Sequence, residues 1–212
     1  LGSTIVSTAG KFGLNLDQAA DSMFTIQSAT LRGADAVRVF NAAAMLSVAG
    51  NADLKNTTEL LARSVMAYGK HSTEAQHISD VLFKTQDRGI VVMEELAHNL
   101  TKVIPSAVAA RVSFEEINAA IATLTTKGLQ TTVASTALNS MLLKLTSGSE
   151  NLDAVFQKLG YDSSATALKQ RGLEYVMRQI SAATGGAAYE LQKLGFNYRD
   201  IKAAAILAND TN

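Results

Sequence analysis

The sequence contains no cysteine, no tryptophan and a single proline in 212 residues. Without cysteine the chain can form no disulfide, no thiolate metal site and no cysteine nucleophile, which fits a reducing compartment. Because proline is the residue that most reliably stops a helix, one proline leaves room for long uninterrupted helices. Charge of one sign is not in excess either, with 19 basic and 19 acidic residues. This balance gives no reason to expect binding to nucleic acid or to an anionic membrane.

Long apolar runs are also missing. The longest smooth run extends only from Ala42 to Leu46, whereas a helix that crosses a bilayer needs roughly 20 apolar residues. We therefore expect no membrane span. The chain begins at Leu1 without a basic segment followed by an apolar one, so we expect no signal peptide. The absence of an initial methionine leads us to expect a fragment of a longer protein.

Apolar residues make up 47% of the chain, and alanine, the best helix former, is abundant among them. Glycines recur at intervals typical of helix ends, where glycine readily adopts the left-handed conformation. This pattern predicts helices separated by glycine stops at Gly33, Gly50, Gly69, Gly89, Gly128, Gly148, Gly160, Gly172 and Gly195. The expected helices before Gly128 cover 17–31, 34–49, Thr57 or Thr58 to 68, Ser72 or Thr73 to 88, 93 to an interruption at Pro105, and Ser113 to Gly128. The next helix carries Ala134, Leu138, Met141 and Leu145 on one face. Shorter helices are expected at 152–159, 165–171, 173–184, 187–194 and 198–208.

The clearest helix start lies at Ser113, where Ser113-Phe114-Glu115-Glu116 has the pattern of a capping box. In such a box the serine hydroxyl accepts a hydrogen bond from one free backbone N–H, and the glutamate reaches back to another. We expect Ser113→Ala to cost about 1 kcal/mol of stability, and Glu116→Ala to cost less.

Apolar side chains recur at helical spacing, and each apolar face requires a partner surface. In the helix at 17–31 we expect Ala20, Met23, Phe24 and Gln27 to be buried. The sequence thus predicts an all-α fold, a multi-helix array of antiparallel helix hairpins with no sheet. We expect a main helical module at 1–148 and a part with shorter helices, packed on it, at 149–212. Further core candidates are Phe40, Leu61, Leu82, Leu96, Ile117, Leu124, Leu138 and Leu145.

Two local patterns permit other interpretations. The β-branched run Ile90-Val91-Val92 could open a strand, but no second candidate strand exists to pair with it, so we favour the start of a helix. The segment at 158–162, Lys-Leu-Gly-Tyr-Asp, returns 35 residues later at 193–197 as Lys-Leu-Gly-Phe-Asn. This echo indicates either a repeated helix pair or two ordinary helix–glycine–cap junctions.

No arrangement of residues indicates chemistry. His71, His77 and His98 are the only histidines, and none belongs to a metal-binding helical motif. Adjacent glutamates at Glu94-Glu95 and at 115–116 point about 100° apart on a helix, and they fit first turns where negative charge is favoured. Gly185-Gly186 lacks the lysine of a phosphate-binding loop. We therefore predict no catalytic, cofactor-binding or metal-binding residues, no cofactor and no enzyme activity.

Three stretches of the sequence follow one another in an order that is informative. The first runs from Ile78–Thr85 through Gly89 and Glu95–Ala97 to Pro105–Ala107. The second is Val112–Glu116, followed by Ala122–Thr125, Gly128 and Ala134–Leu138, and the third is Lys158–Gly160 with Arg171–Leu173. In this order the three stretches resemble the core region of the phage tail tape measure family. One position departs from the family pattern, since the family usually has glycine where this chain has Arg111. This difference concerns the geometry of the turn before Val112.

The resemblance implies a structural protein of a phage or prophage tail, located in the virion tail and assembled in the host cytoplasm. It implies a role in setting tail length and organising the tail tube. The implied partners are tail tube proteins, tail-tip or baseplate proteins and tail assembly chaperones, with possible self-association. Because glycines interrupt the helices, we expect a folded module rather than the measuring rod itself. The alternatives are a helical-repeat binding scaffold unrelated to phage, and an enzyme such as a cell-wall hydrolase module.

Overall fold

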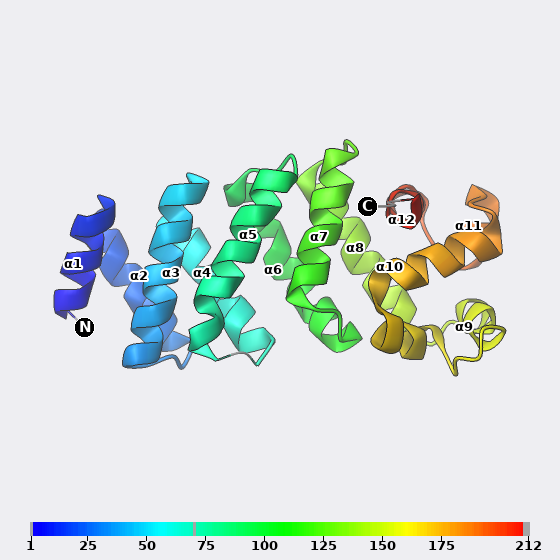
Figure 1. Cartoon of the computed structure of the whole chain (residues 1–212), viewed down its shortest axis with the longest axis horizontal. Helices are drawn as coiled ribbons and strands as arrows, with labels where there is room; N and C mark the ends of the chain where they lie inside the picture. Colours follow the sequence, from blue (N-terminus) through cyan, green and yellow to red (C-terminus); the bar gives the residue numbers. More distant parts are fainter. Residues whose placement is uncertain (1, 70, 210–212) are drawn as a thin grey trace. The chain divides into compact units, whose positions relative to one another are not determined.

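The computed structural model describes residues 2–69 and 71–209, and within them every regular element is helical (Figure 1). The predicted all-α class is confirmed. No helix of the described residues is long and apolar enough to cross a membrane. The elements are α1 (Gly2–Phe12), α2 (Leu16–Ser28), α3 (Ala34–Gly50), α4 (Leu54–Ala67), the 3₁₀ helix η1 (Ser72–Glu74), α5 (Ala75–Arg88), α6 (Met93–Ala110), α7 (Phe114–Thr126), α8 (Thr131–Thr146), α9 (Glu150–Gln157), α10 (Ser164–Thr184), α11 (Ala188–Lys193) and α12 (Tyr198–Asn209).

The chain divides into two compact units, unit 1 at 1–101 and unit 2 at 102–212, with α6 belonging to both. In unit 1, α3 packs against α1, α2, α4 and α5, and successive helices alternate in direction (Figure 1). In unit 2, α7 and α8 form a hairpin, and α12 packs against α7, α8 and α10. These are the antiparallel hairpins that the sequence predicts. The boundary at 148 rests on helix length and stays a prediction.

The core candidates chosen from helical spacing are fully buried. Their exposed fraction is 0% for Phe40, Leu61, Leu82, Leu96, Ile117, Leu124, Leu138 and Leu145. The face predicted for α2 is confirmed at Met23, which is 3% exposed, but wrong at Phe24, which is 71% exposed, and at Ala20, which is exposed. The other buried residues of α2 are Ala19, Ser22 and Ile26. Small residues at 19 and 22 allow α2 to approach α3 and α4 closely, and this packing selects the face that is buried.

The free N–H groups at several helix starts are capped by side chains, and the sequence predicted only some of these capping residues. The predicted cap of α4 at Thr57 or Thr58 is wrong, since Asp53 caps this helix and accepts hydrogen bonds from the Lys55 and Asn56 amides at 2.8 and 3.3 Å. Both threonines are buried inside α4 instead. A residue before Leu54 thus starts the helix one turn earlier than expected, because aspartate satisfies free N–H groups as well as threonine does.

Most of the predicted glycine stops are confirmed, and Gly128 illustrates their geometry. Its φ of 91° turns the chain so that the Leu129 amide donates to the Leu124 carbonyl at 3.0 Å, which closes the end of α7. Two glycines act differently. Gly33 precedes α3 as its N-cap, and Gly50 is the last helical residue of α3, with Asn51 taking the left-handed conformation after it at φ 49°.

The echo between 158–162 and 193–197 is a repeated turn. Gly160 and Gly195 both have positive φ, and in both turns the following aromatic amide donates to the carbonyl five residues earlier. The capping positions differ, because Asn197 caps α12 whereas Ser163, not Asp162, caps α10. The shared part is therefore the helix end and not a complete repeat.

The predicted interruption at Pro105 is wrong, because α6 continues through it from Met93 to Ala110. Proline removes one backbone N–H, but its ring lies on the exposed face, where the unpaired carbonyl can be hydrated. The opposite face of α6 is buried through Leu100, Val103, Ile104 and Ala107, with exposed fractions of 0 to 2%. Burial of this face offsets the lost hydrogen bond.

Residues 90–92 form the turn before α6 and no strand, as the sequence predicts. The Leu96 amide donates to the Val92 carbonyl at 3.0 Å, which is the first hydrogen bond of the helix. The β-branched run therefore leads into a helix, because the described residues offer no strand with which it could pair.

Candidate functional site

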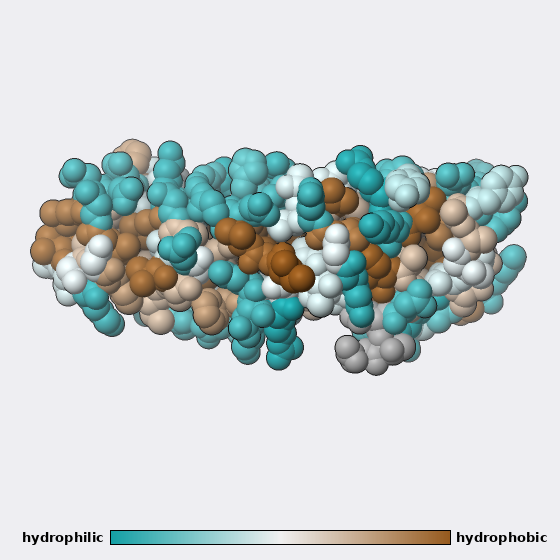
Figure 2. All heavy atoms as spheres, turned by 90° about the horizontal axis from the view of Figure 1, so that it is seen from above, coloured by the Kyte–Doolittle hydropathy of each residue, from teal (hydrophilic) through white to brown (hydrophobic). Residues whose placement is uncertain are grey.

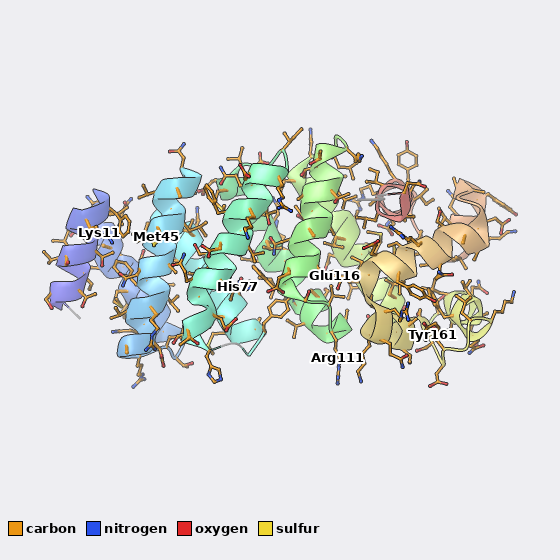
Figure 3. All side chains as sticks on the ribbon, viewed as in Figure 1. Lys11, Met45, His77, Arg111, Glu116 and Tyr161 are labelled. Carbon is orange, nitrogen blue, oxygen red and sulfur yellow. The ribbon has the colours of Figure 1, made fainter. Side chains whose placement is uncertain are left out.

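The three histidines lie on separate elements and all are exposed. His71 precedes η1, His77 lies on α5 (Figure 3) and His98 on α6. Among the described residues, no group of three or more histidine, aspartate or glutamate side chains is placed to hold a metal ion. The arrangement thus offers no assembled metal or acid–base centre in the described part of the chain, and the prediction of no catalytic or metal residues remains a prediction.

Both glutamate pairs occupy first turns of helices, as predicted. Glu94 also has a tertiary role that the sequence did not indicate. Its carboxylate accepts hydrogen bonds from the Asp53 amide at 3.0 Å and from the Asn56 side-chain amide. Glu94 thus joins the start of α6 to the start of α4, which uses its charge for structure rather than for acid–base chemistry.

The Ser113 cap is confirmed, but the reciprocal half of the capping box is wrong. The Ser113 hydroxyl accepts from the Glu116 amide at 3.1 Å. The Glu116 carboxylate turns instead toward α10 and accepts from the Leu173 amide at 2.5 Å (Glu116 is labelled in Figure 3). The physical reason lies at Gly172, whose φ of 81° and ψ of 174° interrupt the helical backbone and leave the next amide without an intrahelical acceptor.

The interruption at Gly172 lies where the sequence predicts one helix to end and the next to begin. The sequence predicts separate helices at 165–171 and 173–184, and α10 consists of two helical segments that meet at Gly172, whose backbone is not helical. An ideal Cβ at this glycine would lie 2.7 Å from Glu116 Oε1. Glycine is therefore required here both for the positive φ and for the close approach of the carboxylate. The sequence indicated this contact only through a glycine, Gly172, within a helical pattern, and nothing in the sequence indicated that Glu116 approaches it.

A second polar cluster surrounds Asp200, which is fully buried in the first turn of α12. One carboxylate oxygen accepts from the Ser140 hydroxyl at 3.0 Å and from the Asn197 amide at 3.2 Å. Lys144 Nζ lies 3.6 Å from the same oxygen and donates to the Gly195 carbonyl. Sequence reading did not single out this aspartate, because Asn197-x-x-Asp200 has the pattern of an ordinary helix start.

Tyr161 and Tyr175 form an aromatic pair in unit 2 (Tyr161 is labelled in Figure 3), with ring centroids 6.1 Å apart. Arg171 lies 4.7 Å from the Tyr175 ring centroid. The hydrogen bond with the Tyr161 hydroxyl, and secondarily burial, raise the pKa of Tyr175 above its ordinary value of 10. A phenol shifted in this direction remains protonated at neutral pH, so the cluster is suited to packing rather than to general base catalysis.

A groove between α1 and α3 has mostly neutral walls. The Thr8 hydroxyl donates to Asn41 Oδ1 across it at 2.8 Å, and Lys11 and Met45 lie on its two sides (Figure 3). Lys11 is the single charged residue in the lining, so the groove has no paired acid and base. Its lining residues are Ser3, Thr4, Ser7, Thr8, Lys11, Phe12, Asn41 and Met45.

Unit 1 exposes several large apolar side chains at one end of its hairpins. Because the helices alternate in direction, the start of α2, the end of α3 and the α5–α6 turn lie at the same end (Figure 1). Leu16, Val48, Ile90 and Val92 are 49, 50, 74 and 55% exposed there. We call these four residues the apolar rim, and Figure 2 shows brown apolar surface over this end.

Comparison with known proteins identifies relatives over almost the whole chain. The profile of the family described as "Phage-related minor tail protein" matches residues 3–205. The "Tape measure protein" of Pneumococcus phage Dp-1 is 22% identical over 188 residues, which cover 87% of this chain and 16% of that protein. The "Probable tape measure protein" of Clostridium phage phiCD119 is 31% identical over 102 residues, covering 48% of this chain and 11% of that protein. No solved structure matches.

Proposed function

Because the chain belongs to the phage-related minor tail protein family, we propose that it is a folded core module of a tape measure protein. In this role it helps to set tail length and organises assembly of the tail tube. The observation that carries the proposal is the family match over residues 3–205. The two tape measure relatives support it, although the chain spans only 16% and 11% of their lengths.

The helical hairpins support a module rather than a measuring rod. A continuous helix rises 1.5 Å per residue, so a rod of this length would extend roughly 300 Å. The described residues form short helices instead, and the longest of them, α10, has 21 residues and a kink at Gly172. Within each of the two units the chain reverses direction between successive helices, so each unit spans far less than the summed length of its helices. We therefore assign length measurement to other parts of the parent protein.

The proposed partners are tail tube proteins, tail-tip or baseplate proteins and tail assembly chaperones, in the virion tail and during its assembly in the host cytoplasm. The apolar rim of unit 1 offers a surface for such contacts and also for self-association. The balanced charge supports no nucleic acid partner. We propose a structural, non-enzymatic role. A scaffold unrelated to phage does not fit the family match.

The test is an in-frame deletion of this segment from the parent gene, with the tails that form counted and measured by electron microscopy. If the segment is an assembly module, few tails form, and any that do form are not shortened in proportion to the deleted residues. If the segment is itself the ruler, tails form in normal number and are roughly 300 Å shorter, as the helical rise requires. That second result would contradict the proposed module.

A control deletion of equal length elsewhere in the parent protein should shorten the tail without reducing tail number, if that region is the ruler. Supplying the deleted segment as a separate polypeptide should raise the number of tails without changing their length. If neither the deletion nor the separately supplied segment changes the number of tails, the assembly role is rejected.

A further inference from the structure

The helices of unit 1 stand in two rows, and one side of the first helix pair is not covered. Helices α1, α3 and α5 lie side by side in one row, with α2 and α4 in the row behind them (Figure 1). Neighbours within a row pack together, since α1 contacts α3, α3 contacts α5 and α2 contacts α4. Among the described residues of unit 1, no helix packs on the side of α1 and α2 that faces away from α3 and α4. The pair α1–α2 is therefore the end of this array.

Burial along the rows agrees with this end position. Of the 11 residues of α1 only Thr8 and Ala9 are buried, and α2 buries four of its 13 residues. The next helix of the second row, α4, buries eight of its 14 residues because it has neighbours on more sides. In proteins built from stacked helix pairs, the outer side of a terminal pair is normally polar, which keeps the protein soluble. A polar outer side is thus expected for α1–α2 if the array ends with this pair.

The outer side of α1 is apolar and nearly flat instead. Gly2, Val6 and Gly10 are spaced four residues apart, so they lie on one side of the helix. Val6 lies two residues, or about 200°, from the buried Thr8, which bonds to Asn41 of α3, so this side faces away from α3. Val6 is 58% exposed, and a Cβ added at either glycine would have no atom within 4 Å.

The outer side of α2 is apolar in the same way. Ala20 and Phe24 are four residues apart and both are exposed, Phe24 to 71%. Phe24 follows the buried Ser22 by two residues, so it too points away from the packed side of its helix. Brown apolar surface covers the end of unit 1 at α1 (Figure 2). We call this surface the outer face, and it consists of Gly2, Val6, Gly10, Ala20 and Phe24. Its composition does not fit a terminal pair that faces water.

From this surface we propose that a further antiparallel helix pair of the parent protein packs on the outer face and extends both rows. The occupant follows from continuity with the packing already present, because each row is built by one helix laid against the next, and α1–α2 lies on α3–α4 in this way. The glycines at 2 and 10 allow the backbone of a helix to approach closely on either side of Val6. The added helices are thus amphipathic, with an apolar face of larger side chains opposite α1.

We assign this pair to the residues that precede the segment in the parent protein, because α1 is the first helix of its row. The inference rests on the proposed function, since it requires a parent protein longer than the segment. The two tape measure relatives meet that condition, because the chain spans 16% and 11% of their lengths. A second copy of this chain is the competing occupant, and it would cover the outer face only in proportion to protein concentration.

Cysteine labelling tests the proposal, because the chain has no native cysteine. Single cysteines replace Val6 or Phe24 on the outer face, and a cysteine in place of Phe83 of α5, which is 43% exposed, is the matched control. Each is placed in the 212-residue chain and in a form extended by the roughly 50 residues that precede it in the parent gene, enough for one helix pair. We expect the extension to slow labelling at 6 and 24 at least about tenfold, at any protein concentration, and to leave labelling at 83 unchanged.

Charge on the outer face should prevent this packing. In the extended form, Ala20→Lys together with Phe24→Lys should return labelling at 6 to the rate of the unextended chain, whereas Phe83→Lys should not. In the unextended chain the same two lysines should leave the urea midpoint nearly unchanged, because both positions are exposed there. If the extended form does not fold, the full-length parent protein, labelled at the same positions, takes its place.

Two results would overturn the proposal. One is equal labelling at 6 and 24 with and without the residues that precede the segment. The other is protection that appears in the unextended chain and increases with its concentration, which would identify a second copy as the occupant. Labelling reports packing alone, so its outcome is independent of the tail counts that test the assembly role.

Discussion

The carboxylate of Glu116, in the first turn of α7, accepts a hydrogen bond from the backbone amide of Leu173 in α10 at 2.5 Å. The two residues are 57 positions apart in the sequence. Because Gly172 interrupts α10, the amide of Leu173 belongs to a second helix start inside that element. Glu116 therefore caps a helix other than its own, and α7 fixes the kink of α10.

This relationship reverses the order of stability effects expected from the sequence. Ser113→Ala removes one N-cap bond and should cost about 1 kcal/mol. Glu116→Ala leaves the partly buried Leu173 amide without an acceptor and should cost about 1–3 kcal/mol. Both values are measured from urea unfolding followed by circular dichroism. Glu95→Ala, at an exposed first-turn glutamate of α6, is the control. A Glu116→Ala variant no less stable than this control would show that the bond to Leu173 does not contribute.

Gly172→Ala should destabilise by about 2–3 kcal/mol, because φ 81° with ψ 174° is a conformation essentially restricted to glycine. The new Cβ would also lie 2.7 Å from Glu116 Oε1. Gly128→Ala is the matched control, since Gly128 has φ 91° but no atom near its Cβ position. The difference between the two variants includes the contact with Glu116. It should shrink when Glu116→Ala is present, and additive effects in the double variant would argue against the contact.

Arg111→Gly should stabilise unit 2 by up to about 1 kcal/mol. Arg111, which is labelled in Figure 3, directly follows α6. Its φ of 58° is a left-handed conformation that costs a non-glycine residue about 1–2 kcal/mol. The greater freedom of glycine in the unfolded chain offsets part of this gain. Lys127→Gly, at φ −85°, should destabilise instead, because no strain is relieved there. Thermal unfolding measures both, and a lower midpoint for Arg111→Gly would refute the strain argument.

Gly50→Ala should destabilise unit 1 by about 1–3 kcal/mol through overpacking, although alanine is the better helix former. An ideal Cβ at Gly50 lies 2.9 Å from Met93 Cγ and 3.1 Å from Gln86 Oε1. Gly10→Ala, in α1 with no atom near its Cβ position, should be neutral or stabilising. If both substitutions stabilise the protein, α3 and α6 are not as close as the structure places them.

Replacing His71, His77 and His98 together with glutamine should change the free energy of unfolding by less than about 0.5 kcal/mol, as is usual for exposed side chains. Elemental analysis of the purified protein should find no stoichiometric zinc in either form. Zinc that is present in the parent and lost in the triple variant would overturn the prediction of a cofactor-free protein.

The sequence by itself determined which segments after residue 15 are helical and where most of them end, whereas α1 (Gly2–Phe12) was not among the predicted helices. The cap at Ser113 and the stop at Gly128 depend on hydrogen bonds among residues three to five positions apart, so local sequence contains both partners. The buried leucines at 124, 138 and 145 were also predictable. A helix with one wide apolar face must turn that face toward the core, whichever neighbouring helix packs against it.

The tertiary structure alone decided the features that depend on distant partners. Phe24 is exposed because contacts with α3 and α4 select another face of α2, and α6 continues through Pro105 because its opposite face is buried. Glu116 binds Leu173 rather than its own helix start, and Asp200 meets Ser140, 60 residues away. A carboxylate has several possible donors within its reach, and only the packing of helices determines which of them is near. Local propensity therefore specifies the helices, while burial and the choice of polar partners are properties of the assembled fold.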